Sequence, residues 1–416
     1  MRIALVASGC PDEPGRLERR VERLARGLAD RGAHVEVLAQ GPGRASVQHR
    51  DGVTTRTFPS VAGPLRFAVA PRLRERLRQI QHEFDVIDVH TRQAPLALAV
   101  ASLRLRRFVL TPCASAETFL GWPRTRATRA MLASAPLIVC RSEIERDLLC
   151  AGIPEVAHRT TVVPDGIDPE AIRAAEPFDV PDTVVLAVDR LDRSTGVGRA
   201  IAAMASLEPE FRLVVVGTGP ARDRLEAFAE DLRVSARVQF TGPLPDAELH
   251  RWLRTARVVV ALSGERSSGT AVSEGCAAGV SVVASDLPIH RHAAERVGGS
   301  VIFVAPRSSP LDVADAIAEG SQLGVIPNPD LPNSTAISWD AMVDATRDLY
   351  GELADTVRPA VPEQWADELI GPSHRHAGRL VNPAFLGHSR NAADRASWWR
   401  TRPRPTDRAT GAPRWP

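Results

Sequence analysis

The chain has 416 residues, of which 44% are hydrophobic and 25% are charged, and its formal net charge at pH 7 is +2. This composition excludes a fibrous or wholly disordered chain and is typical of a soluble globular protein with room for two domains. The nearest candidate for a membrane span, 94–103, is well short of the roughly 20 residues required, and the apolar start is too short for a secretory signal, so a cytoplasmic location is expected.

Strands and helices alternate through the first half of the chain. Helix 16–32 places Leu17, Val21, Leu24 and Leu28 on one face. Further helices are expected at 94–103 and 125–133, and the expected strands are 2–8, 34–39, 84–90, 107–112 and 136–142. Such alternation predicts a parallel sheet with helices on both faces.

A second α/β series follows a connection rich in Pro and Asp at 177–183. Its expected strands are 184–191, 211–217, 236–242, 256–263, 279–286 and 300–306. A last helix is expected at 338–355. Beyond about residue 358 the periodicity ends, which predicts a disordered tail, with contact to a membrane interface or a partner as the alternative.

The stretch RLVVVGTGPARDRLEAFAED, 212–231, runs from a strand through two glycines into a helix. Gly217 and Gly219 match the start of a dinucleotide-binding loop, but Arg222 occupies the place of its third glycine. The loop also lies well inside the second series, whereas a nicotinamide site would follow the first strand of a domain. The pair indicates a tight turn or a close backbone approach, and an NAD-dependent oxidoreductase is the least favoured function.

The order of several segments resembles the retaining glycosyltransferases of family 4. The segments are VVPDGID at 162–168, VVLAVDRLDRSTGVGRAI at 184–201, LVVVGTGPARDRLE at 213–226, SEGCAAGVSVVASD at 273–286 and SWDAMVDATRDLY at 338–350. The resemblance spans about 1–355 and implies the GT-B fold, two Rossmann-like α/β domains facing across a cleft. It implies an acceptor-side domain at 1–168, a donor domain at 169–337, a cross-over helix at 338–357 and the tail at 358–416.

The resemblance implies a metal-independent enzyme whose donor is a UDP- or GDP-linked sugar. Arg190 matches the arginine that neutralises the diphosphate, whereas the family lysine falls on Thr195, for which Arg193 is the expected substitute. Glu274 matches the second glutamate of the family pair, and the first falls on Arg266, beside Glu265. The remaining expected donor-binding residues are Gly217, Gly219, Gly242, Gly269 and Thr270.

On the acceptor side, the family's double glycine reads Gly15-Arg16, so that Arg16 either crowds or binds an approaching phosphate. The family motif Thr-Pro-His reads Thr-Pro-Cys, which places Cys113 where a histidine faces the donor sugar. His90 matches a family histidine at a strand end, with a packed or capping role as an equal alternative. Glu265, His90 and Cys113 are therefore the candidate catalytic residues.

Two alternatives follow from the four altered positions Arg16, Cys113, Thr195 and Arg266. The enzyme acts on an unusual donor or acceptor, from the cell envelope or secondary metabolism, or the chain is a non-catalytic nucleotide-sugar-binding regulator or scaffold. A sugar-nucleotide epimerase on the same fold is a third reading. No nucleic-acid partner is expected.

Charge and cysteine patterns add further expectations. Residues 1–150 carry 24 Arg against 15 acids, a balance of +9, whereas 151–350 carry 18 against 28, a balance of −10. The basic half is either an ordinary solvated surface or a contact for an anionic acceptor or for the inner membrane face. The five cysteines show no metal-ligand spacing, so neither a metal site nor a disulfide framework is expected.

Overall fold

The structure is a computed structural model that describes residues 1–9, 15–41, 44–62, 68–91, 107–113, 132–192, 195–264, 268–323 and 338–355, together with 96, 100, 103 and 105. Several predictions fall outside these ranges. They concern Cys10, Arg193, Glu265, Arg266, the tail from 358, and most of the helices expected at 94–103 and 125–133.

An eight-stranded sheet forms the centre of the N-terminal domain, in the order β10-β9-β8-β7-β1-β2-β4-β3. Every pairing in it is parallel except that of β3 with β4. The central strands are buried on both faces, which explains why they read as continuous apolar runs. The strands are β1 (Arg2–Ala7), β2 (His34–Gly41), β3 (Ser46–Arg50), β4 (Val53–Pro59), β7 (Val86–Thr91), β8 (Phe108–Pro112), β9 (Leu137–Cys140) and β10 (Thr160–Val162).

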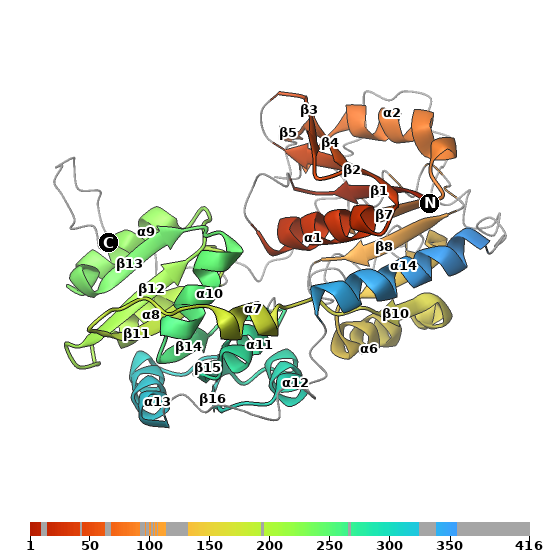
Figure 1. Ribbon diagram of the computed structural model, residues 1–416. Helices are drawn as coiled ribbons and strands as arrows, with labels where there is room; N and C mark the ends of the chain where they lie inside the picture. Colours follow the sequence, from red (N-terminus) through yellow and green to blue (C-terminus); the bar gives the residue numbers. More distant parts are fainter. Residues whose placement is uncertain are drawn as a thin grey trace, which may run out of the picture. The chain divides into compact units, whose positions relative to one another are not determined.

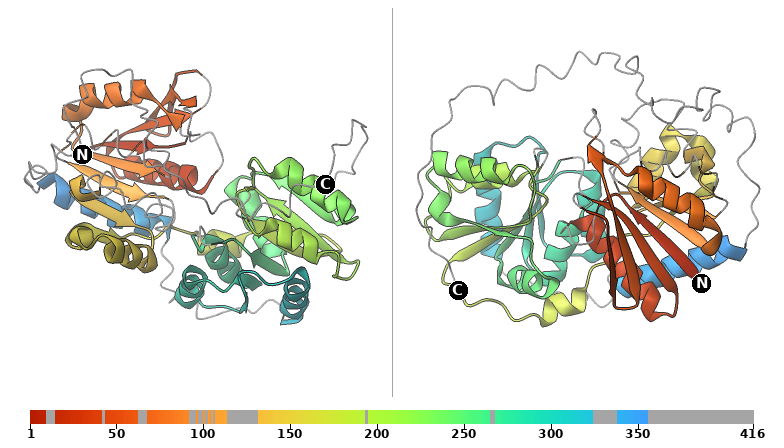
Figure 2. Two further views of the ribbon diagram at one scale, coloured as in Figure 1. Left: turned by 180° about the vertical axis from the view of Figure 1, so that it is seen from behind. Right: turned by 90° about the horizontal axis from the view of Figure 1, so that it is seen from above.

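Helices cover both faces of this sheet, as the alternating pattern predicts (Figures 1 and 2). On one face, α1 (Arg16–Asp30) packs with the C-terminal helix α14 (Trp339–Asp355), and all four apolar residues of the predicted stripe on α1 are buried. On the other face lie α2 (Pro71–Ile80) and α6 (Glu143–Gly152). The short elements are β5 (Val61–Ala62), β6 (Ala68–Val69), η1 (Gln81–Glu83) and η2 (Pro154–Arg159).

The hairpin of β3 and β4 is a feature that the sequence reading missed. Arg50 pairs with Val53, so the connection consists of Asp51 and Gly52 alone. Both residues have positive φ, 48° and 74°. An Asp-Gly pair in this conformation is a favoured two-residue hairpin turn, because its twist matches that of the strands.

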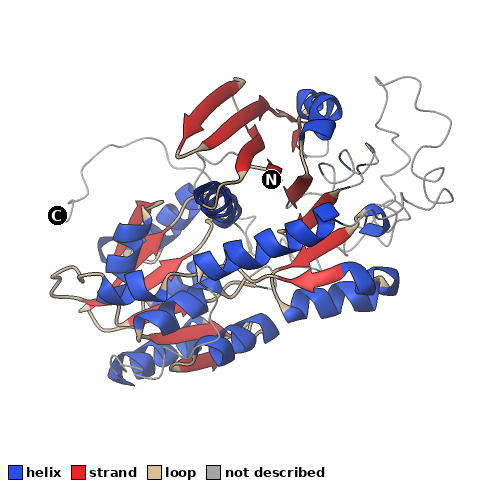
Figure 3. Cartoon of the chain, turned by 45° about the vertical axis from the view of Figure 1, so that its right-hand side comes forward, coloured by secondary structure: helices blue, strands red, loops and turns tan. Residues whose placement is uncertain are grey.

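The C-terminal domain contains a six-stranded parallel sheet in the order β13-β12-β11-β14-β15-β16, and helices cover both of its faces (Figure 3). The strands are β11 (Thr183–Val188), β12 (Phe211–Val216), β13 (Val238–Gly242), β14 (Val258–Ala261), β15 (Ser281–Ser285) and β16 (Val301–Val304). One face packs on α7 (Pro169–Ala174), α10 (Asp246–Thr255), α11 (Thr270–Ala278) and α12 (Pro288–Val297). The other packs on α8 (Val197–Ala203), α9 (Arg222–Asp231), η3 (Ser235–Arg237) and α13 (Pro310–Leu323).

Together the two sheets form two parallel-sheet, Rossmann-like domains, and the predicted fold class is confirmed. Although α14 follows the C-terminal domain in the sequence, it packs against α1 and β7 of the N-terminal domain. Among the helices of the described ranges, none combines the length and the apolar character needed to cross a membrane.

Candidate functional site

A pocket of about 430 Å³ brings residues of both domains together. Its walls come mainly from α1 on one side and from the carboxyl ends of β11, β12 and β13 on the other. In open parallel sheets, ligands bind at the carboxyl ends of the strands. The residues that line it are Gly15, Glu18, Arg19, Glu22, Arg23, Arg26, Arg50, Asp165, Val188, Asp189, Arg190, Val216, Gly217, Thr218, Pro243, Leu244, Pro245, Asp246, Thr270, Glu274 and Trp339.

Arg190 and Glu274 line this one pocket from different elements of the C-terminal domain. Arg190 follows β11, is exposed, and is held at its backbone, whose N–H donates to Oδ1 of Asp189 at 2.8 Å. Glu274 lies on α11 and is only 7% exposed. An exposed guanidinium and a buried carboxylate thus line the same pocket.

The predicted glycine turn lies at the pocket wall, and its glycines are required by the protein's own backbone. A Cβ on Gly217 would lie 1.9 Å from the carbonyl oxygen of Asp189, and a Cβ on Gly219 would lie 2.2 Å from that of Leu191. Gly217 and Gly242 also have positive φ, 137° and 78°. The turn therefore packs directly on the loop that carries Arg190.

The arginine in place of the third glycine has a structural role in this turn. Nε of Arg222 donates to Oε1 of Glu226 at 2.7 Å, and its Nη2 donates to the carbonyl oxygen of Phe240 at 3.3 Å. These bonds connect the first turn of α9 to β13. A third glycine would allow the helix to pack closely on the strand, whereas here the side chain of Arg222 lies between α9 and β13.

Replacing Gly217 with alanine is expected to lower the free energy of unfolding by about 3 kcal/mol or more, because the methyl group meets a backbone oxygen and the residue keeps a strained φ. Urea unfolding followed by circular dichroism measures this. Gly351→Ala is the matched control, because a Cβ at this position on α14 would meet no atom within 4 Å. A free energy of unfolding in Gly217→Ala equal to that of the wild type would contradict the close packing of the turn.

The N-terminus of α11 also reaches the pocket. Gly269, which precedes the helix, has φ of 73°, and a Cβ there would lie 2.9 Å from Cβ of Ala293. Thr270 begins the helix and lines the pocket, and its hydroxyl lies 2.9 Å from that of Ser268. Free N–H groups at such a terminus favour an anion.

Residues from the N-terminal domain meet Glu274 across the pocket. Nη1 of Arg19 lies 3.6 Å from Oε1 of Glu274, and its Nη2 lies 3.2 Å from Oδ1 of Asp246. Arg23, one turn later on α1, also pairs with Asp246. Burial alone would raise the pKa of Asp246, but the two arginines outweigh burial and lower it, so this carboxylate is charged.

The other predicted donor and acceptor-side residues are placed as follows. The hydroxyl of Thr195 donates to the carbonyl oxygen of Asp192 at 3.1 Å, a bond within its own turn. Gly15 lines the pocket directly before α1, which begins at Arg16. The side chain of Arg16 is outside the described part of the structure.

His90 lies in a buried polar cluster at the end of β7. Its side chain is 1% exposed, and Nε2 lies 3.0 Å from Oδ2 of Asp88. Asp88 also accepts hydrogen bonds from the hydroxyls of Thr111, at 2.9 Å, and Tyr350 of α14. His90 is not among the residues that line the pocket, and this placement favours the packed role over the catalytic one.

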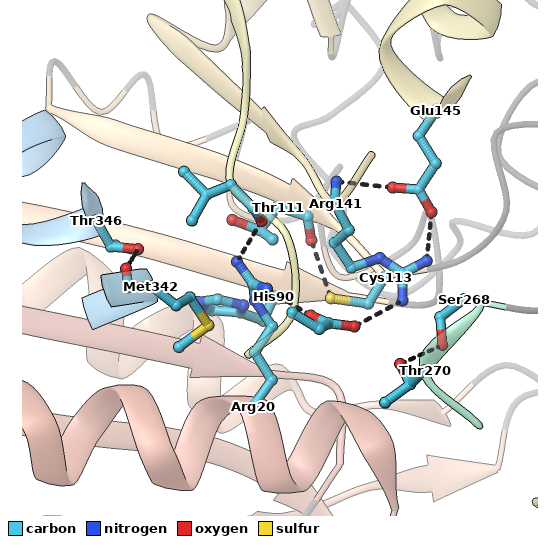
Figure 4. A network of polar contacts seen from close by, with 12 residues as sticks. Arg20, His90, Thr111, Cys113, Arg141, Glu145, Ser268, Thr270, Met342 and Thr346 are labelled. Atoms are coloured by element: carbon cyan, nitrogen blue, oxygen red, sulfur yellow. Dashed lines mark hydrogen bonds and ion pairs between the residues drawn. The ribbon is translucent and has the colours of Figure 1, made fainter. Parts of the chain in front are cut away.

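Cys113 lies next to this cluster, following β8. Its Sγ donates to the carbonyl oxygen of Thr111 at 3.4 Å, and the residue is half-buried (Figure 4). Like His90, it is absent from the residues that line the pocket. Its predicted catalytic role therefore stays a prediction.

A second buried pair was missed by the sequence reading. Arg20 is 2% exposed, and its guanidinium donates to Oδ1 of Asp165 at 2.5 Å and to the carbonyl oxygen of Val163 at 3.2 Å. Arg141 reaches the same carboxylate at 3.8 Å (Figure 4). A signal was available, because Arg20 lies three residues after Leu17 and four before Leu24, on the buried stripe of α1.

The cluster around His90 predicts a pH-dependent stability. Burial would lower the pKa of His90, but the carboxylate of Asp88 outweighs burial and raises the pKa to about 9. The unfolded value is about 6.5, so the stabilisation is complete below pH 6.5 and is lost as pH rises through 9; it amounts to roughly 3 kcal/mol. Chemical denaturation at pH 6 and pH 9.5 should show this decrease, and His90→Gln should remove most of it. An equal decrease in both proteins would contradict the assignment.

Two family models match adjacent parts of the chain. The model described as Glycosyltransferase Family 4 matches residues 17–171, and the model described as Glycosyl transferases group 1 matches residues 168–322. The chain belongs to glycosyltransferase family 4. Members of this retaining family transfer a hexosyl group from a nucleotide-sugar.

Two curated relatives of this family 4 glycosyltransferase are named for different activities. This chain is 27% identical over 342 residues to a phosphatidyl-myo-inositol mannosyltransferase of Mycobacterium tuberculosis, covering 77% of this chain and 86% of the relative. It is 27% identical over 435 residues to a D-inositol 3-phosphate glycosyltransferase of Acidothermus cellulolyticus, covering 88% of this chain and 94% of the relative.

Solved structures with the same fold include Anabaena HepE in complex with UDP and glucose, with a TM-score of 0.64 and 17% identity over 84% of this chain and 99% of that one. This likeness supports the GT-B fold of the family 4 glycosyltransferase. Within the described ranges, no group of three or more His, Cys, Asp or Glu side chains is arranged to hold a metal ion.

Proposed function

We propose that this family 4 glycosyltransferase transfers a hexosyl group, with retention, from a UDP- or GDP-linked sugar to an anionic acceptor of the cell envelope or of secondary metabolism. The observation that carries the proposal is that Arg190 and Glu274 line one pocket at the carboxyl ends of the donor-domain strands. A guanidinium suits a diphosphate, and a carboxylate accepts hydrogen bonds from both hydroxyls of a ribose.

The chemistry requires stabilisation of the leaving nucleoside diphosphate as its negative charge develops. In this proposal Arg190 and the N-terminus of α11 at Thr270 face the diphosphate, while Glu274 holds the ribose. Gly217, Gly219 and Gly242 shape the loop beside the nucleotide without contacting it through side chains. Because the turn packs on the loop that carries Arg190, it fixes the position of the Arg190 backbone.

The acceptor proposal rests on the relatives and on charge. The two curated relatives are named for acceptors that contain inositol and phosphate, so such acceptors are the first to test here. The basic N-terminal domain includes Arg72, Arg74 and Arg78 on the exposed side of α2. These three exposed arginines, of which Arg78 pairs with Glu75, support peripheral contact with an anionic membrane face as a further part of the proposal.

The direct test incubates the purified full chain with UDP-glucose, UDP-N-acetylglucosamine, GDP-mannose or ADP-glucose. Each donor is combined with inositol 1-phosphate, inositol 3-phosphate or vesicles containing phosphatidylinositol. Product formation is followed by mass spectrometry, and the anomeric configuration by NMR. We expect one donor to be consumed with retention. Binding of nucleoside diphosphates without turnover of any donor, across a wider acceptor panel, would contradict the transferase.

A non-catalytic nucleotide-sugar-binding regulator or scaffold is the second candidate. Two observations favour it: the thiol of Cys113 is bonded to its own strand end, and the hydroxyl of Thr195 to its own turn. Cys113 lacks the imidazole, and Thr195 lacks the positive charge, that the family places at these positions. Saturable nucleotide binding without hydrolysis or transfer is the result that this candidate predicts.

A further inference from the structure

Arg19 of the N-terminal domain forms an ion pair with the predicted ribose carboxylate, Glu274. Its guanidinium lies between Glu274, at 3.6 Å, and Asp246, at 3.2 Å, and its side chain is 30% exposed. Gly15 precedes it by one helical turn, and both residues line the pocket that also contains Arg190 and Thr270.

Only one of the two family positions for a cation that binds the diphosphate holds a charged residue in this chain. At pH 7 the diphosphate of a nucleotide-sugar carries two negative charges, and Arg190 offers one positive charge. Thr195, at the place of the second cation, is neutral and bonded to Asp192. Arg193 lies outside the described residues, and among the described residues that line the pocket every arginine other than Arg190 comes from the N-terminal domain.

Arg19 can turn to the diphosphate and leave both of its carboxylate partners with other polar partners. Asp246 has two arginine partners, so it keeps Arg23 when Arg19 leaves. Glu274 exchanges the 3.6 Å contact with Arg19 for the hydroxyls of the ribose. Because a ribose connects directly to its diphosphate, a guanidinium beside Glu274 is already within a short side-chain rotation of the phosphates.

We infer that Arg19 binds the diphosphate of the donor from the N-terminal domain and supplies the positive charge that is missing at Thr195. This inference rests on the proposed function, since it needs a nucleoside diphosphate in the pocket. It makes binding of the donor depend on both domains. The ion pairs of Arg19 with Asp246 and Glu274 are then the resting position of a donor-binding residue.

The test compares Arg19→Gln and Arg19→Lys with the wild type by calorimetric titration of UDP, UMP, GDP and GMP. Arg19→Gln should weaken binding of the preferred diphosphate about tenfold or more, and binding of its monophosphate much less. Arg19→Lys should recover part of the loss, because it keeps the charge without the two-pronged geometry. Arg146→Gln is the control, because Arg146 on α6 pairs with Glu143 and Asp147 of its own helix and is not among the residues that line the pocket.

Three results would overturn the inference. If Arg19→Gln binds the diphosphate as tightly as the wild type, or more tightly, Arg19 only forms ion pairs with Asp246 and Glu274 that compete with donor binding. If the affinity of Arg19→Gln falls by the same factor for diphosphate and monophosphate, Arg19 acts through Glu274 and not on the diphosphate. If Arg146→Gln weakens diphosphate binding as much, the effect comes from the net charge of the protein and not from Arg19. Absence of binding to the wild type would instead refute the proposed function itself. Thermal unfolding of each variant verifies that it is folded.

Discussion

Replacing Glu274 with glutamine is expected to weaken nucleoside diphosphate binding, and to lower kcat/KM for the donor, by about a hundredfold. The carboxylate offers both oxygens as acceptors to the ribose hydroxyls, whereas the amide offers one oxygen and presents a donor in place of the other. Two weakened hydrogen bonds to a charged group account for roughly 3 kcal/mol, which corresponds to that factor. The side chain is nearly isosteric and lies on a well-packed helix, so the fold should persist.

Calorimetric titration and initial-rate measurements test this expectation. Glu226→Gln is the matched control, because Glu226 is a half-buried partner of Arg222 on α9 and is not among the residues that line the pocket. Affinity and turnover within twofold of the wild type in Glu274→Gln would show that the carboxylate does not contact the nucleotide. The assignment of the donor pocket would then be wrong, although the family would stand.

Replacing Asp88 with asparagine is expected to lower the free energy of unfolding by about 3–5 kcal/mol, the usual effect of removing one partner from a buried charged pair. Asp88 is 1% exposed and faces His90, Thr111 and Tyr350. Burial would raise its pKa, but the charge of His90 and these hydrogen bonds outweigh burial and lower it, so the carboxylate is ionised. Its loss leaves the imidazolium of His90 without a counter-ion in the core.

Guanidinium unfolding followed by circular dichroism measures this effect. Asp340→Asn is the control. Asp340 lies on α14, as Tyr350 does, and it also pairs with an arginine, Arg31, but its side chain is 85% exposed. The double variant with Tyr350→Phe should lose less than the sum of the two single losses, since both substitutions disrupt one cluster. A loss under about 1 kcal/mol in Asp88→Asn would mean that the cluster contributes little to stability.

The fold was predictable because its signals are local. Apolar runs and a regular alternation of strands with helices define both sheets, and the stripe of Leu17, Val21, Leu24 and Leu28 is buried as predicted. The missed hairpin also had a local signal in Asp51-Gly52. The resemblance to family 4 could be recognised because its segments keep their order from residue 162 to residue 350.

The site was only partly predictable, because its contacts join residues that are far apart in the sequence. Arg19 and Glu274 are 255 positions apart, and Tyr350 reaches Asp88 across 262. Periodicity places each residue on a face of its own element but does not indicate which distant face it meets. Arg20 and Asp88 each interrupt an apolar pattern, which marks them as unusual, yet their partners became evident only from the structure.

The central claim is that Arg190 and Glu274 bind opposite ends of one ribose diphosphate. The most direct measurement is a crystal structure of the protein with the nucleoside diphosphate that binds most tightly. We predict the ribose hydroxyls within hydrogen-bond distance of Glu274 and a phosphate oxygen within that distance of Arg190. A nucleotide bound elsewhere, or in this pocket with both side chains directed away from it, would contradict the account.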